Sequence, residues 1–222
     1  MPANDGSATP GTQHAAVRDA VLRWIVQGTL HPGDVLPLDV VVARTGASAD
    51  TARHALRELC ELGVAHADGS GVVIAHPTAS NMAETDEIRH ILEDVAVRRF
   101  VQQATDTQVA ALGRAVDAVG EVAAQPDPAL DQLVRARDWF FVLMLRTAGL
   151  ATRDLLRNLR SHAGLVMSLA VAGPGRPGEV VEELRAIHEA LAARDADAAI
   201  AACDRHRTNS TDAGLKQLGN AP

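Results

Sequence analysis

The sequence predicts a mainly α-helical protein with an N-terminal winged helix-turn-helix and a C-terminal antiparallel bundle of six or seven helices. Three short helical patterns precede residue 63, and two short apolar segments separated by glycines follow them. From residue 80 onward apolar residues recur every three or four positions, without strand signals. We therefore expect a disordered arm over residues 1–12, a first domain over 13–77 and a helical domain over 78–218.

The first two helices are predicted from their apolar periodicity and their glycine ends. Residues 15–27 place Val17, Val21 and Ile25 on one face, and Gly28 follows. After a connection over 30–36, a short apolar helix over 40–45 ends at Gly46, which can take the positive φ that stops a helix.

The third helix is predicted over residues 48–59. Ser48 is a natural N-cap, because its hydroxyl can accept from a first-turn backbone N–H. Arg53 and Arg57 are one turn apart and therefore project from the same face, opposite the apolar one. An ordinary amphipathic surface helix would show the same pattern, so the segments that follow decide between the two interpretations.

Those segments predict a two-stranded wing. Residues 64–68 and 72–76 have strand character, and Gly69-Ser70-Gly71 between them has the composition of a hairpin turn. A helix, a turn, a second helix with outward arginines and a wing is the order in which such a module presents a helix to a DNA groove.

Several phrases in this region occur at a specific spacing. They are IVQGTLHPGDVL at residues 25–36, ARTG at 43–46, ARHALR at 52–57 and LGV at 62–64. Over this first third the chain resembles the GntR family of bacterial transcription regulators. The resemblance implies a double-stranded DNA operator, contacted by Arg44, Ser48, Thr51, Arg53, His54, Arg57, Gly69 and Ser70.

The start of the third helix departs from the family pattern. Family members commonly carry an arginine at the position of Ala49, and Asp50-Thr51 stands where they have Thr-Pro. Loss of one bidentate arginine removes about 1–3 kcal/mol of discrimination at one base pair. The sequence therefore leaves two alternatives, a different operator or impaired DNA reading.

Charge limits how the chain can bind nucleic acid. The net charge is −7, which argues against indiscriminate coating of DNA. Between residues 14 and 77 five arginines face seven carboxylates, and five histidines lie in the same span. We expect weak non-specific affinity, and tighter DNA binding at mildly acid pH as histidines become charged.

Two phrases of the second half resemble the helical FCD effector domain of the FadR subgroup. They are EIRHILE at residues 87–93 and ELRAIHEALAARD at 183–195, with His206 beyond them. One apolar stripe in the first of these helices consists of Ile88, Ile91, Leu92, Val95 and Ala96. The sequence GPGRPG at 173–178 breaks the helical pattern.

Many FCD domains bind a divalent metal through one Asp and three His. Here those positions correspond to Arg137, Phe141, Leu184 and His206, so the resemblance implies that only His206 is retained. One imidazole is too few ligands for a transition metal. We therefore predict no metal or other cofactor. A relocated site from His162, His188 and His206 is the less favoured alternative, and a solvated or hydrogen-bonded side chain is the default for each.

A pocket without metal is expected to be more apolar and to hold a small organic, anionic effector. Arg89 or Arg137 is the candidate anchor for its acidic group, although Arg89 is equally well explained as a solvated surface charge. The predicted effector-binding residues are Arg89, Arg137, Asp138, Phe141, Met144, His162, Leu184, His188 and His206.

These observations predict a ligand-responsive transcription regulator that reads a palindromic site as a homodimer. The alternative is a ligand sensor or partner-binding protein of the same fold with impaired DNA reading. An enzyme is not predicted, since the sequence has no Ser/His/Asp order, phosphate loop or GxSxG. Only Cys60 and Cys203 are present, and neither a membrane-length apolar run nor a signal peptide is found, so a cytoplasmic location is expected.

Overall fold

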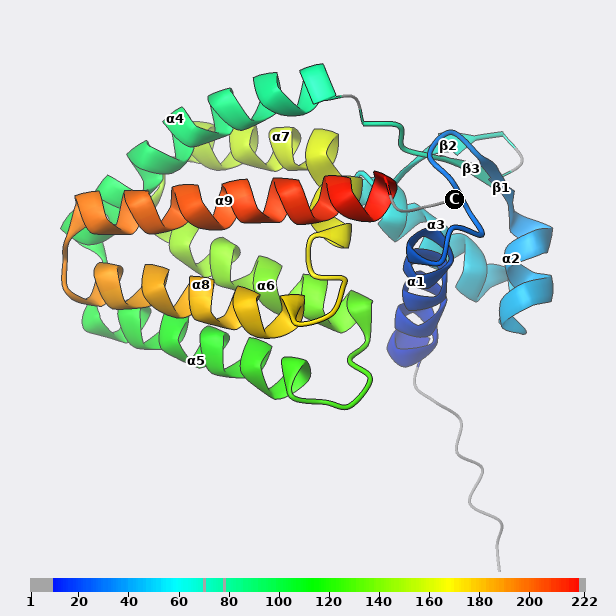
Figure 1. Ribbon diagram of the computed structural model, residues 1–222, viewed down its shortest axis with the longest axis horizontal. Coiled ribbons are helices and arrows are strands. Elements are labelled where there is room, and N and C mark those ends of the chain that lie inside the picture. The colour runs from blue at the N-terminus through cyan, green and yellow to red at the C-terminus, as the bar shows by residue number, and fades with distance from the viewer. Residues whose placement is uncertain (1–9, 70, 78, 220–222) are drawn as a thin grey trace, which may run out of the picture.

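A computed structural model describes residues 10–69, 71–77 and 79–219, and not the side chains of residues 10, 11, 79, 81 and 160–162. The winged unit and the helical bundle lie side by side, with helices α4 to α9 running lengthwise away from the winged unit (Figure 1). The elements are α1 (Pro10–Val26), β1 (Val35–Pro37), α2 (Leu38–Thr45), α3 (Ala49–Glu61), β2 (Ala65–Asp68), β3 (Gly71–Ile74), α4 (Ala79–Gln103), α5 (Asp106–Ala123), α6 (Leu130–Met144), the 3-10 turn η1 (Leu145–Thr147), α7 (Leu150–Leu169), α8 (Arg176–Ala192) and α9 (Ala196–Gly219).

The start of the chain differs from the prediction. Helix α1 begins at Pro10, so residues 10–12 are helical and not part of the expected disordered arm. The remainder of that predicted arm, residues 1–9, lies outside the described residues.

The wing is a three-stranded sheet, where two strands were predicted. Its order is β1-β3-β2, and both pairings are antiparallel, with Val35 opposite Val73 and Ala65 opposite Ile74. The predicted connection over 30–36 therefore supplies a strand. It does so because a two-stranded hairpin leaves the outer backbone groups of β3 unpaired, and β1 satisfies them.

The predicted caps around the turn between α2 and α3 are confirmed. Gly46 has a φ of 69° and donates its N–H to the carbonyl oxygen of Val42. The hydroxyl of Ser48 accepts from the backbone N–H of Thr51 at 3.1 Å. These two contacts stop one helix and start the next within three residues, which fixes the direction of α3.

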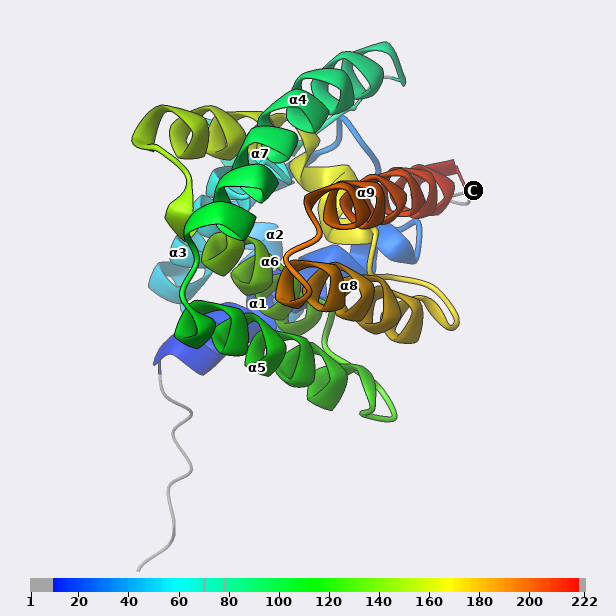
Figure 2. The ribbon, with the colours of Figure 1, turned by 90° about the vertical axis from the view of Figure 1, so that its left-hand side faces the viewer.

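The predicted helical bundle is confirmed, and the described part of it has six α-helices and one 3-10 turn. An end-on view shows α4 and α7 on one side and α5 on the opposite side, with α6, α8 and α9 between them (Figure 2). The core is built around Phe100, Leu112 and Phe140, which are fully buried. Three members of the predicted stripe, Ile88, Ile91 and Val95, do not join this core because their side chains are exposed, whereas Ala96 is buried.

The two units share apolar core. Leu165 and Leu169 of α7 are buried in the hydrophobic cluster of the winged unit, together with residues of α1 and α3. Gly164, one residue earlier, lies against the turn that follows α3. A Cβ atom at this position would be 1.7 Å from the carbonyl oxygen of Leu62. The end of α7 is therefore packed directly onto the base of the winged unit.

Substitution Gly164→Ala tests this close approach. The added methyl would collide with backbone and force the two units apart, at a cost of about 1–3 kcal/mol in the free energy of unfolding. We expect a lower midpoint in thermal or urea unfolding. Gly178→Ala is the matched control, because a Cβ at Gly178 meets no atom within 4 Å. Equal stability of the two variants would contradict the contact.

Candidate functional site

The outward face of α3 carries two exposed arginines. Arg57 is exposed and has no side-chain partner within the described residues. The Arg53 guanidinium is also exposed, but it forms an ion pair with Asp50 one turn earlier, at 2.6 Å. Such a pair between exposed side chains is weak. Both guanidinium groups therefore remain accessible to a partner of opposite charge.

The other residues predicted to contact DNA differ in their exposure and in their neighbours. Ser48 is exposed, and Gly69 is exposed at the end of the wing. The Arg44 guanidinium lies 4.4 Å from the centre of the Trp24 ring. The ring of His54 stacks on His14 of α1 at 4.2 Å, which turns it toward α1.

The last two predicted DNA contacts are Thr51 and Ser70. Thr51 is buried, and its hydroxyl accepts from Ser48 at 2.9 Å. The side chain of Thr51 lies beneath the cap, so its position gives no support to the predicted DNA contact, which stays a prediction. Ser70 lies outside the described residues.

A cluster of charges joins α3 to the bundle. Arg18 of α1 is buried and binds both carboxylate oxygens of Asp131 in α6, at 2.7 and 2.9 Å. The same guanidinium donates to Glu58 of α3. Arg135 pairs with Asp131 at 3.1 Å and with Glu58 at 3.6 Å. Burial opposes the charged form of Arg18, but these carboxylates hold its pKa above the ordinary value.

The position that the sequence resemblance assigns to a metal is filled by protein side chains. The buried Arg137 guanidinium donates to Asp138 and to the carbonyl oxygen of Met167. The Phe141 ring stacks on the imidazole of His206, with the ring centres 5.3 Å apart. A cation and two apolar side chains, Phe141 and the buried Leu184, do not fit a divalent metal.

His206 belongs to a hydrogen-bonded network instead. Its Nδ1 lies 2.6 Å from Glu183, and Glu183 also accepts two bonds from the buried Arg176, at 2.7 and 2.9 Å. Burial lowers the pKa of His206, and the nearby Arg137 and Arg176 lower it further. Burial by itself would raise the pKa of Glu183, but the bonds from His206, Arg176 and Asn209 lower it to about 2. A neutral His206 imidazole that donates a hydrogen bond to an ionised Glu183 agrees with the lowered pKa of each group.

The cavity beside this network is small. It measures about 30 Å³ and is lined by Arg89, Arg137, Phe141, Met144 and His206, among others. Five of the predicted effector residues therefore do meet, but around a space that holds about one water molecule.

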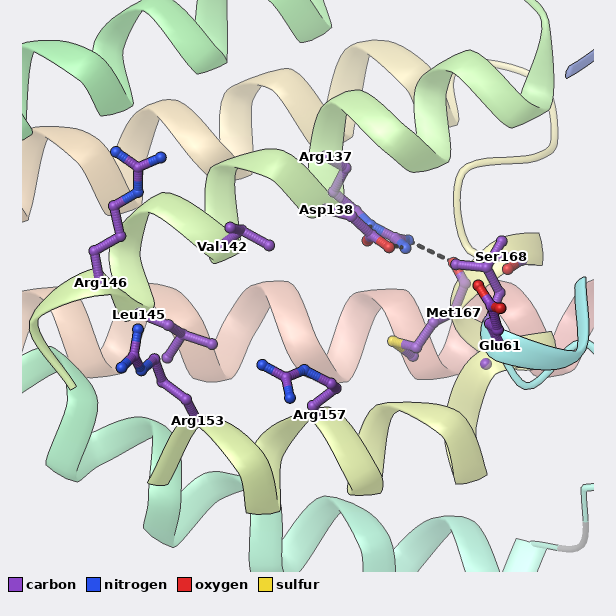
Figure 3. Close-up of a pocket in the computed structure, with 12 residues that line it drawn as sticks. Glu61, Arg137, Asp138, Val142, Leu145, Arg146, Arg153, Arg157, Met167 and Ser168 are labelled. Carbon is purple, nitrogen blue, oxygen red and sulfur yellow. Dashed lines mark hydrogen bonds and ion pairs between the residues drawn. The ribbon is translucent and has the colours of Figure 1, made fainter. Parts of the chain in front are cut away.

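A larger cavity lies between α6, α7 and the end of α3 (Figure 3). Its volume is about 360 Å³. The basic side chains that line it are Arg137, Arg146, Arg153 and Arg157. Its other walls include Glu61 and Leu62 at the end of α3.

Two family models match the chain. The FCD domain model matches residues 84–209, which is more than half of the chain, and the model of bacterial regulatory proteins of the gntR family matches residues 13–74. The chain belongs to the GntR family. It is a transcriptional regulator with an FCD effector domain. The sequence-based resemblance is thus confirmed, and no curated protein matches this regulator.

Solved structures have the same fold along nearly the whole GntR chain. Escherichia coli McbR/YncC is 19% identical with a TM-score of 0.63, and 92% of this chain and 98% of that chain are covered. A transcriptional regulator described as GntR from Rhodococcus sp. RHA1 is 24% identical with a TM-score of 0.59, covering 94% and 99%. At these identities the likeness establishes the fold alone.

The structure of this GntR regulator does not bring all of the predicted effector-binding residues together. Asp138 lines the larger cavity, whereas Leu184 is in the apolar core and His188 lies against Gly113 of α5. Within the described residues, His188 and His206 do not belong to a common cluster of potential metal ligands. The side chain of His162 lies outside the described part of the structure. Sequence reasoning missed Arg153 and Arg157, although their spacing is the same as that of Arg53 and Arg57.

The network around His206 predicts loss of stability in acid. The unfolded chain protonates His206 below about pH 6.5, and the folded chain resists this, so stability falls as the pH drops below that value. Glu183 stabilises the folded chain above pH 4.5, and this contribution, at most about 3 kcal/mol, is lost as the pH falls toward 2.

Urea unfolding at a series of pH values measures both stages. The exposed neighbour Glu182 provides a control, because Glu182→Gln should leave the pH profile unchanged. Glu183→Gln should flatten the lower stage. A free energy of unfolding that stays constant from about pH 5 to 3 in the wild-type protein is the contrary result.

Proposed function

We propose that this GntR regulator binds a palindromic double-stranded DNA site as a homodimer in the bacterial cytoplasm, and that a small organic anion controls the binding. The observation that carries the proposal is the capped helix α3 with Arg53 and Arg57 exposed on its outer face. A helix of 13 residues that starts at a fixed cap can enter the major groove with two guanidinium groups aimed at bases or phosphates.

Substitution of Arg57 tests DNA reading. A DNA site is first selected from a random library with the wild-type protein. We expect Arg57→Ala to weaken binding to that site on the order of 10- to 100-fold, because one charged contact to DNA is worth about 1–3 kcal/mol. Fluorescence anisotropy at several salt concentrations measures the affinity. If Arg57 contacts a phosphate, loss of that contact also lowers the steepness of the salt dependence of the affinity by about one.

Arg205→Ala is the matched control, because it removes the same charge from an exposed residue that lies on α9 and not on α3. Its affinity should equal that of the wild-type protein. Failure to select any DNA with a salt-dependent affinity would exclude DNA binding by this chain.

One observation favours the alternative of a sensor with impaired DNA reading. Asp50 is exposed at the start of α3 and neutralises part of the charge of Arg53, where a reading helix meets phosphates. The variant Asp50→Asn separates the two readings. Unchanged output in the cell after loss of both Arg53 and Arg57, together with no gain of affinity in Asp50→Asn, would favour the sensor.

An exposed apolar strip supports the homodimer. Ile91 is 60% exposed, and Ile88 and Val95 on the same helix are exposed as well. A second copy that covered the strip would remove three large apolar side chains from water and would place two reading helices on one DNA.

Substitution Ile91→Glu should convert the dimer into a monomer, because a carboxylate buried against a partner's apolar face pays a large desolvation cost. Size-exclusion chromatography with light scattering gives the mass. Val35→Glu is the control, because Val35 is an apolar residue of the winged unit that is 52% exposed, and this variant should stay dimeric. A wild-type mass of one chain would refute the dimer, and a dimeric Ile91→Glu protein would refute this interface.

A further inference from the structure

We propose that the anionic effector binds in the cavity of about 360 Å³ between α6, α7 and the end of α3, and not in the interior of the bundle. The proposal rests on the proposed function and names the site and the ligand class. The ligand is a small organic anion with one acidic end and an apolar body.

The acidic end is assigned by a group of arginines whose charge is not fully compensated. Arg153 and Arg157 project from α7 toward the cavity, and Arg146 lies at the same end (Figure 3). The Nε of Arg153 is buried and has no hydrogen-bond partner. The Arg146 guanidinium lies 5.5 Å from the centre of the Trp139 ring and has no carboxylate partner among the described residues. A buried donor without an acceptor is costly, so an acidic ligand would satisfy this end.

Carboxylates do not cancel this charge. Asp154 pairs with Arg157 at 3.0 Å, and both side chains are exposed, so the pair is weak. Asp138 also lines the cavity, but Arg137 binds it at 2.8 Å. Glu61 lies at the opposite end of the cavity from Arg146 (Figure 3).

The apolar body is assigned by the middle of the cavity. Val142, Leu145 and Met167 line it between the arginine end and the end near α3. A volume of about 360 Å³ suits a small organic ligand and is far larger than an inorganic ion needs. The interior cavity of about 30 Å³ cannot hold such a molecule, because Arg137 and the Phe141–His206 pair occupy the space around it.

The position of this cavity connects it to DNA reading. One helix, α7, contributes Arg153 and Arg157 to the cavity, Gly164 to the contact with Leu62, and two leucines to the winged core. Glu61 and Leu62 also line the cavity directly. A ligand that changes the position of α7 therefore changes the position of the winged unit, and the spacing of two such units on DNA.

The probe for the test is 8-anilinonaphthalene-1-sulfonate, an anion with an apolar body whose fluorescence rises on binding. We expect one saturable site per chain in the full-length protein. Arg153→Met should weaken binding at least 10-fold, which is 1.4 kcal/mol. Arg114→Met is the matched control, because Arg114 is exposed on α5 on the opposite side of the bundle (Figure 2), and it should bind like the wild-type protein.

A second variant fills the cavity without removing a charge. Val142 is 45% exposed at the cavity wall, so Val142→Trp should fold and should also weaken the probe at least 10-fold. Equal affinity in Arg153→Met and wild type, or equal binding of the uncharged N-phenyl-1-naphthylamine, would overturn the proposal. So would Arg153-dependent binding of inorganic phosphate without binding of the sulfonate, since the site would then take a free ion.

DNA affinity without probe keeps the two proposals apart. Arg153→Met should bind the selected DNA like the wild-type protein, because Arg153 lies outside the reading surface. If the wild-type protein bound no DNA, the proposed function would be refuted, but the proposed anion site would be unaffected. Loss of the arginine-dependent probe site would refute the present inference alone.

Discussion

The buried guanidinium of Arg18 holds three parts of the chain in one arrangement. It comes from α1, contacts Glu58 on the inner face of the reading helix and binds both oxygens of Asp131 at the start of the bundle's α6. A buried charge must be fully paired, so loss of either carboxylate partner leaves the Arg18 guanidinium only partly compensated. The outer face of α3 thereby remains exposed, because its inner face is committed to α1 and α6.

A second constraint is the buried guanidinium of Arg137 inside the bundle. Its hydrogen bonds to Asp138 and to the carbonyl oxygen of Met167 tie α6 to α7. Glu183, His206 and Arg176 complete a polar network that occupies the interior. The bundle has thus gained internal hydrogen bonds where a ligand pocket would need open volume. The open volume lies instead beside α7, where the two units meet.

Local chemistry allowed most of the fold to be predicted. The turn around Gly46 and Ser48 is set by residues within three positions of one another, and the apolar periodicity placed the helices. The third strand could not be predicted, since β1 has only three residues and its pairing with β3 joins residues far apart in the chain. The stripe of Ile88, Ile91 and Val95 shows that periodicity finds a helical face but does not say which neighbour covers it.

The candidate site was predicted less completely, for the same reason. The sequence identified Arg53 and Arg57 because both lie on one short helix. It brought Arg137, Phe141 and His206 together correctly by resemblance, but the size of the space around them depends on side-chain packing between helices. Arg146, Arg153 and Arg157 form a group only after η1 and α7 have folded against α6.

Two leucines of α7 belong to the hydrophobic core of the winged unit, and this affects how the two units could be exchanged between regulators. Sequence comparison divides the chain near residue 78, yet Leu165 and Leu169 complete a hydrophobic cluster made mainly by residues before that boundary. A hybrid regulator joined at residue 78 would therefore inherit an incomplete core. Transfer of this winged unit to another effector domain therefore requires that the end of α7 be transferred as well.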